Sequence, residues 1–268
     1  MTTPAGATTA GIRAEPTGGV VAAGGTLALA EHANLLGGAL TDLSTLTVAQ
    51  TVALFRNFQD RPDFPDVVKT VLPQIVAPHA RAAAAVTAQW YNELAPTSAF
   101  RATPVVDLPA ARIDNTIGWA LHAPGQATPL ERIAGSAKRM VFDASRDTVV
   151  ANARIEGVRW VRQARPDACA FCRLMATRGP VYHSETSATE VVGARGRPRG
   201  AQVLGDKYHD HCRCIAAPLR AGSSYIPPAY TAQWQQDYID ATRALRKDGK
   251  QPDLSNVLTH MRANSDAH

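Results

Sequence analysis

Apolar residues recur at helical spacing through most of the first half of the chain. The segment 27–40 predicts one helix, and Thr47-Val-Ala-Gln50 has the form of a capping box that predicts the start of another. A third helical stretch covers 63–94, but proline lacks an amide hydrogen, so Pro73 and Pro78 are expected to break or kink it. The pattern therefore predicts several helices in succession.

The clearest helix start lies at Thr128-Pro129-Leu130-Glu131. Threonine can cap the first turn, proline suits that turn, and the glutamate can close the box by reaching back to the threonine. An apolar face follows, and the helix is expected to end at Gly157. Asp143, Arg146 and Asp147 fall on the opposite face of this helix, where we expect them to lie in water.

The pattern changes after Gly157. Residues 158–163 have the β-branched and aromatic content of a strand, and 181–183 and 215–219 are shorter strand candidates. Helical spacing returns after Pro227-Pro228. Shorter helices are predicted at 110–122, 230–245 and 254–261.

Composition changes this picture little. Hydrophobic residues make up 45% of the chain and charged residues 19%, which is typical of a soluble globular protein. No apolar run reaches the roughly 18 residues of a membrane helix, so no membrane partner is expected. Residues 1–25 are rich in Gly, Ala, Thr and Pro, and we expect a disordered tail there.

The net charge of +5 is modest, but positive residues are concentrated in one part of the chain. Six arginines precede or flank the first cysteine pair: Arg154, Arg159, Arg162, Arg165, Arg173 and Arg178. Three more follow in a Gly/Pro-rich stretch: Arg195, Arg197 and Arg199. A solvated loop surface explains this pattern, and so does a basic strip that touches DNA or an acidic partner.

The four cysteines form two close pairs and occur nowhere else in the chain. Cys169 and Cys172 make a CxxC unit, and Cys212 and Cys214 follow about forty residues later, with His209 beside them. Without an export signal, disulfides are disfavoured in a reducing cytoplasm, and thiolates at this spacing can bind one tetrahedral ion. Soft thiolate donors favour Zn2+ over magnesium or calcium. Unliganded thiols and two disulfides remain the alternatives.

These residues offer five donors for the four positions of a zinc ion. Four cysteines form one candidate set, and three cysteines with His209 form the other. Either set would close the coordination shell, which is typical of a structural site and not of a catalytic one. Arg173 and Arg213 are the neighbours expected to offset the thiolate charge.

The two motifs CAFC and HDHCRC resemble those of the phage Mu protein F-like family of minor head proteins, in their actinobacteriophage form. The histidine of the family motif falls on His209 and its cysteines on Cys212 and Cys214, which favours His209 as a ligand; Asp210 stands where the family usually has proline. The resemblance covers about residues 130–220. It implies a non-enzymatic minor capsid or head-morphogenesis protein of a tailed phage.

The same resemblance implies partners and a location. Such proteins associate with the portal, the scaffold or the major capsid protein, and packaged DNA is a further candidate partner. The expected location is the virion, in the capsid interior or at the portal vertex, with the host cytoplasm as the site of assembly.

Two other functions compete with this one. CxxC followed by His-Asp-His also resembles HNH-type endonucleases, in which His209 or His211 would act as the general base. Those enzymes need a second CxxC and a downstream Asn, whereas this chain has CRC, and no His or Asn follows that motif until Asn256. A zinc-stabilised DNA-binding module is the second alternative, and the basic stretch is its motivation.

The predicted fold class is α+β and mostly α. We expect a disordered tail at 1–25, a helical region at 26–157, a small zinc-stabilised α/β subdomain at 158–225, and C-terminal helices at 226–268.

Overall fold

The computed structural model describes residues 29–178, 212–221 and 226–265. Two long helices come first, α1 (Leu29–Phe58) and α2 (Phe64–Glu93), followed by α3 (Ala110–His122) and a third long helix, α4 (Pro129–Glu156). Strand β1 (Arg159–Gln163), helix α5 (Ala170–Ala176) and strand β2 (Ile215–Leu219) come next. Two C-terminal helices complete the order, α7 (Tyr230–Lys247) and α8 (Leu254–Asn264). The fold is mostly helical with one small sheet, as predicted.

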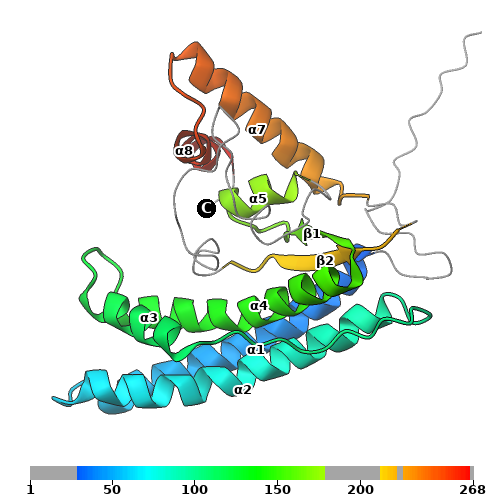
Figure 1. Cartoon of the computed structure of the whole chain (residues 1–268). Helices are drawn as coiled ribbons and strands as arrows, with labels where there is room; N and C mark the ends of the chain where they lie inside the picture. Colours follow the sequence, from blue (N-terminus) through cyan, green and yellow to red (C-terminus); the bar gives the residue numbers. More distant parts are fainter. Residues whose placement is uncertain (1–28, 179–211, 222–225, 266–268) are drawn as a thin grey trace, which may run out of the picture.

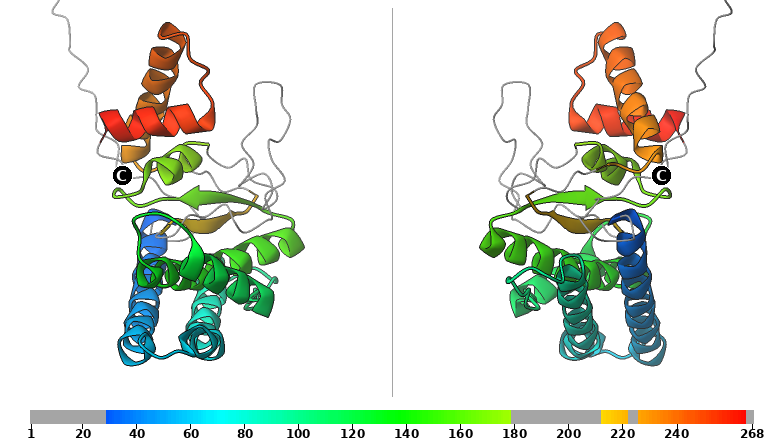
Figure 2. Two further views of the ribbon diagram at one scale, coloured as in Figure 1. Left: turned by 90° about the vertical axis from the view of Figure 1, so that its left-hand side faces the viewer. Right: turned by 90° about the vertical axis from the view of Figure 1, so that its right-hand side faces the viewer.

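The elements are stacked in layers. The long helices α1, α2 and α4 form one layer, with α3 against one end of α4 (Figure 1). The two strands lie on α4, α5 lies over the strands, and α7 and α8 pack on α5 on the side away from the long helices (Figure 2). The small sheet and α5 therefore stand between the long helices and the C-terminal pair.

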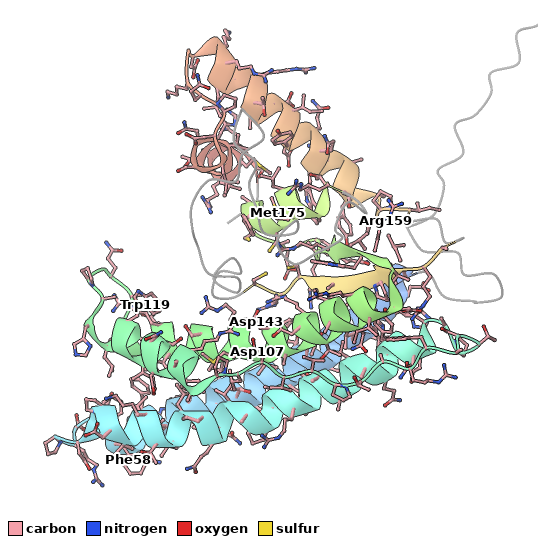
Figure 3. The ribbon with its side chains drawn as sticks, in the orientation of Figure 1. Phe58, Asp107, Trp119, Asp143, Arg159 and Met175 are labelled. Carbon is pink, nitrogen blue, oxygen red and sulfur yellow. The ribbon has the colours of Figure 1, made fainter. Side chains whose placement is uncertain are left out.

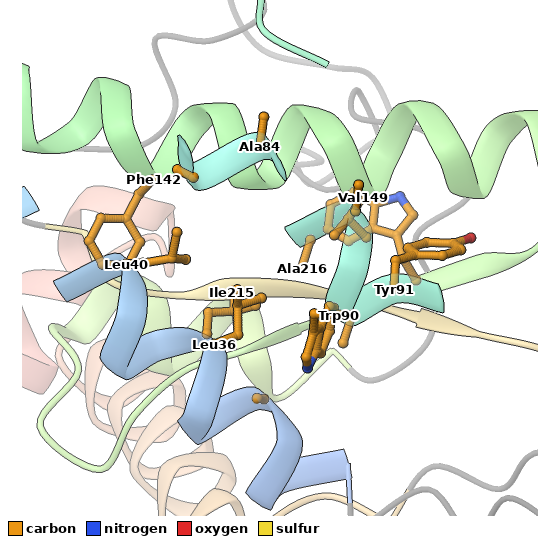
Figure 4. Close-up of a cluster of buried hydrophobic side chains, with 14 of the residues drawn as sticks. Leu36, Leu40, Ala84, Trp90, Tyr91, Phe142, Val149, Ile215 and Ala216 are labelled. Atoms are coloured by element: carbon orange, nitrogen blue, oxygen red, sulfur yellow. The ribbon is translucent and has the colours of Figure 1, made fainter. Parts of the chain in front are cut away.

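The main core joins the long helices to β2. Leu36 and Leu40 of α1 meet Phe142 of α4 and Ile215 of β2 in this cluster (Figure 4). Each of these four side chains is at most 4% exposed. Burial of large apolar side chains is worth about 1.5–3 kcal/mol each, so this cluster attaches the strand firmly to the helices.

Helix α1 is continuous, and the predicted start of a second helix at Thr47 is wrong. Thr47 lies inside α1, where its hydroxyl donates to the carbonyl of Leu43 at 2.8 Å. Thr47 is fully buried. A threonine that bonds to the preceding turn and packs in a core has no need to cap, so tertiary packing overrides the local capping signal.

Helix α2 is continuous as well, so the break expected at Pro73 and Pro78 is absent. Each proline leaves one carbonyl of the preceding turn without its helical donor, at Lys69 and at Gln74. Both of those residues are exposed, so water can satisfy the freed carbonyls. The buried stripe of α2 packs against α1 and α4 along its length and holds the helix together.

Helix α4 begins and ends as predicted. The Thr128 hydroxyl accepts from the Glu131 amide at 3.2 Å, and the Glu131 carboxylate accepts from the Thr128 amide at 2.6 Å. Gly157 follows the helix with φ of 75°, a left-handed conformation that favours glycine. The reversal at Gly157 sends the chain directly into β1.

The two predicted strands 158–163 and 215–219 are confirmed and pair with each other. They are antiparallel, with Arg159 opposite Leu219 and Gln163 opposite Ile215. Every residue of β2 is buried, because the strand packs on α4 and α1 and pairs with β1. The third strand candidate, 181–183, lies outside the described residues, as does the tail 1–25.

The predicted C-terminal helices are confirmed, and they pack on α5. Leu174 and Met175 of α5 meet Ala241 and Leu245 of α7 and Met261 of α8 in a separate apolar cluster. Within the described ranges, no helix has the length and apolar content needed to cross a bilayer.

Candidate metal centre

Two short pieces of chain bring the cysteines together. Cys169 is the N-cap of α5, and its sulfur accepts from the amide of Cys172 in the first turn at 3.4 Å. Cys212 and Cys214 lie directly before β2, in extended chain whose alternate residues share one side. The antiparallel pairing of β1 with β2 places this segment beside α5.

Three sulfurs form a tight buried group. Those of Cys172, Cys212 and Cys214 all lie within 4.8 Å of one another, and Cys212 is 3.2 Å from each of the other two. These three cysteines are at most 3% exposed. A disulfide needs a bond of about 2.05 Å, whereas sulfurs around one zinc ion with 2.3 Å bonds are separated by about 3.8 Å. The 3.2 Å separations are too long for a disulfide and shorter than those around a bound zinc, and three clustered thiols are donors that could hold a metal ion.

The structure brings together three of the five predicted ligands in this group. Cys169 stands beside it, because its thiol is hydrogen-bonded to that of Cys172, and its side chain is half-buried. His209 lies outside the described residues.

Arg146 and Asp143 are buried, so the prediction that their face of α4 lies in water is wrong. They are 2% and 4% exposed, because the 212–214 segment covers this face. Figure 3 labels Asp143 on α4. The Asp143 carboxylate accepts from Arg146 Nη1 at 2.7 Å and also pairs with Arg112 of α3.

Arg146 holds the 212–214 segment on α4. Its Nε donates to the carbonyl oxygen of Cys214 at 3.0 Å, and its Nη2 donates to the carbonyl oxygen of Cys212 at 2.9 Å. The same Nη2 is 3.3 Å from Cys212 Sγ and 3.9 Å from Cys214 Sγ. One side chain therefore positions both the backbone and the sulfurs of this half of the centre.

Arg162 of β1 reaches the same sulfurs from the other side. It is 1% exposed, and its Nη2 donates to Cys214 Sγ at 3.0 Å. Its guanidinium also lies over the Phe171 ring at 5.6 Å. Sequence reasoning placed Arg162 only in the basic stretch, because β1 also contains Arg159 and Gln163 and its sequence does not distinguish the buried arginine from the exposed one.

The arginines predicted to offset the thiolate charge are placed elsewhere. Arg173 donates to the carbonyl of Ala168 at 2.6 Å and lies over the Trp234 ring at 5.6 Å. Arg213 lies 3.8 Å from the carboxylate of Asp167. Proximity in sequence was the wrong guide: Arg213 lies between two cysteines whose side chains share one side, and Arg173 lies in α5 with its guanidinium at the carbonyl of Ala168.

The surroundings give the three buried thiols different pKa values. Hydrogen bonds with the thiols of Cys169, Cys212 and Cys214, together with burial, raise the pKa of Cys172. Burial raises the pKa of Cys212 to about 11. Burial alone would also raise the pKa of Cys214, but hydrogen bonds from Cys172 and Cys212 and the charges of Arg162 and Arg146 outweigh it, so that pKa is lowered. The Cys214 sulfur is therefore the one best prepared to carry negative charge.

The basic stretch is divided between surface and interior. Arg154 and Arg159 are exposed and Arg165 is partly so, whereas Arg162 and Arg173 are buried. The stretch is thus neither wholly a solvated surface nor a continuous basic strip. Arg195, Arg197 and Arg199 lie outside the described residues.

Helix α7 covers the cysteine cluster. Trp234 of α7 belongs to the same buried cluster as Cys172, Cys212 and Cys214. The Tyr230 hydroxyl donates to the carbonyl of Ala164 at 2.9 Å, which fixes the start of α7 beside the end of β1. The sulfurs are therefore enclosed by α4, the strands, α5 and α7.

Fold and site together define a mostly helical protein with a small cysteine-rich subdomain that can bind a metal ion. Residues 28–241 match the family described as VG15 protein. The chain belongs to this family of phage-associated proteins, and it is a phage protein. Neither the comparison with curated proteins nor that with solved structures gives a match.

Proposed function

We propose that this phage protein is a non-enzymatic minor capsid or head-morphogenesis protein, whose cysteine cluster holds one structural Zn2+. Membership of a phage family supports the phage setting. The CAFC and HDHCRC motifs, which resemble those of Mu protein F-like minor head proteins, support the head role.

The burial of the sulfurs is the observation that supports a structural, and not a catalytic, role for the metal. Cys172, Cys212 and Cys214 are enclosed at 3%, 1% and 3% exposure, with Trp234 packed against them. A catalytic zinc needs a position open to water or substrate, whereas a structural zinc is closed. When bound, the ion would cross-link α5 to the segment before β2, and Arg146 and Arg162 would orient the sulfurs.

The proposed partners are the portal, the scaffold or the major capsid protein, with packaged DNA as a further candidate. The proposed location is the capsid interior or the portal vertex, with assembly in the host cytoplasm. The helical surfaces would make these contacts, because the cysteine cluster is buried inside the subdomain.

Deletion of the gene in the phage that carries it tests the head role. We expect few normal heads by electron microscopy, and rescue by the wild-type gene supplied in trans. In purified wild-type particles treated with nuclease and protease, mass spectrometry should still detect the chain. A normal yield of infectious particles without the protein would contradict the proposal.

The endonuclease alternative is tested on the purified protein. His209 and His211 would be its reactive residues, and a magnesium-dependent nicking activity lost in His211→Ala would establish it. Absence of nicking in zinc-loaded protein is the result that we expect.

A further inference from the structure

We propose that Cys169, Cys172, Cys212 and Cys214 together form a four-thiolate shell for one zinc ion, with Arg146 and Arg162 as hydrogen-bond donors to its sulfurs. This inference rests on the proposed zinc site and specifies its ligands. It selects one of the two ligand sets that the sequence leaves open.

The start of α5 supports Cys169 as the fourth ligand. The amide of Cys172, in the first turn of α5, donates to Cys169 Sγ at 3.4 Å. The Cys169 thiol also contacts the Cys172 thiol and packs with the buried cluster. In a CxxC unit at a helix start, amide donation to the first sulfur stabilises the negative charge of a thiolate.

The fourth position lies next to Cys169. The other three sulfurs are mutually within 4.8 Å, and Cys169 is not part of that group. Its side chain is half-buried at the N-cap of α5, whereas the other three thiols are buried and already grouped. Ion binding would therefore move the Cys169 side chain most.

Two buried guanidinium groups favour a shell of four thiolates over one of three thiolates and an imidazole. Arg146 Nη2 lies 3.3 Å from Cys212 Sγ, and Arg162 Nη2 lies 3.0 Å from Cys214 Sγ. They are 2% and 1% exposed, and although Asp143 already pairs with Arg146, a hydrogen bond from either guanidinium is stronger to a thiolate than to a neutral thiol. A zinc ion with four thiolates has a formal charge of −2, and one with three thiolates and a neutral imidazole has −1. The cationic surroundings thus suit four thiolates best.

Zinc X-ray absorption on the wild-type protein tests the ligand set directly. We expect a single shell of four sulfurs at about 2.3 Å. Three sulfurs and one nitrogen at about 2.0–2.1 Å would overturn the four-thiolate shell while leaving the zinc site intact. Protein that binds no zinc at all would overturn both.

Cobalt substitution identifies the fourth ligand. In Cys169→Ser, sulfur-to-cobalt charge-transfer absorption should fall by about one quarter, because one of four thiolates is lost. His209→Ala should keep the wild-type spectrum. The reverse pattern, with Cys169→Ser unchanged and His209→Ala altered, would overturn the assignment.

The role of Arg162 is tested with a matched pair of variants on the same strand. Arg162→Met should weaken zinc binding by about tenfold and shift the cobalt charge-transfer band to lower energy, because the sulfur lone pair loses its donor. Arg162→Lys should restore the band in part. Arg159→Met, at an exposed position of β1, should change neither property. An unshifted band in Arg162→Met would remove Arg162 from the site.

Discussion

Arg146 Nε donates to the carbonyl oxygen of Cys214 at 3.0 Å, although the two residues are 68 positions apart in the chain. This contact joins α4, the central long helix, to the segment that carries two of the candidate metal ligands. Because Arg146 also donates to the carbonyl of Cys212, this half of the centre is fixed by the protein itself. The other half of the centre is carried by α5, which packs on β1, α7 and α8.

Arg146→Met should destabilise the protein by about 3 kcal/mol, because it removes the donors to two buried carbonyls and one cation beside the buried Asp143. The free energy of unfolding from urea titration measures this. Arg154→Met, at an exposed position of the same helix, is the matched control and should change the stability by less than about 0.5 kcal/mol. Equal stability of the two variants would show that Arg146 does not hold the segment.

Removal of the metal should loosen one side of the molecule more than the other. Helices α7 and α8 pack on α5, whose cysteines lie opposite the 212–214 segment across the proposed ion. Chelation should therefore speed hydrogen exchange in α5, α7 and α8 by about tenfold or more, while α2 keeps its protection. Zinc added back should restore the slow exchange, and calcium should not. Uniform loss of protection along the chain would contradict this division.

Alkaline pH should destabilise the protein through Tyr91. Burial, followed by the hydrogen bond to Glu156 at 2.6 Å, raises the pKa of the Tyr91 hydroxyl above its ordinary value of 10.0. Below pH 10 the Tyr91 hydroxyl is protonated in both the folded and the unfolded protein. Above pH 10 it loses its proton in the unfolded protein but keeps it in the folded protein, so the free energy of unfolding falls as the pH rises.

A Tyr91→Phe variant should lose less stability at alkaline pH than the wild type does. Near neutral pH it should be less stable by about 1 kcal/mol, because the hydrogen bond of the hydroxyl is lost. Thermal unfolding of both proteins across the range from neutral to strongly alkaline pH measures the difference. If the two stability curves stayed parallel above pH 10, Tyr91 would not be responsible.

Local signals in the sequence predicted much of the fold. The capping box at Thr128 and the stop at Gly157 are present in the structure because each depends on neighbouring residues only, and the strand at 158–163 is present with β2 as its distant partner. Thr47 and Pro73 gave the wrong prediction because long helices packed on both sides tolerate residues that would end an isolated helix.

The grouping of Cys172, Cys212 and Cys214 was predictable from the sequence, and their surroundings were not. Paired cysteine spacing of this kind is typical of metal-binding thiols. Burial of Arg146 and Arg162 depends on which segments cover α4 and β1, and those contacts join residues far apart in the chain. Sequence neighbours such as Arg173 and Arg213 were the natural choice from the sequence, and the fold directs both elsewhere.

Elemental mass spectrometry of protein purified under reducing conditions tests the central claim most directly. The account predicts one zinc per chain in the wild type, and loss of the zinc together with a lower melting temperature in Cys214→Ser. Wild-type protein that is folded and free of metal would contradict the zinc site, and the head role would then depend on the motif resemblance and the phage family alone.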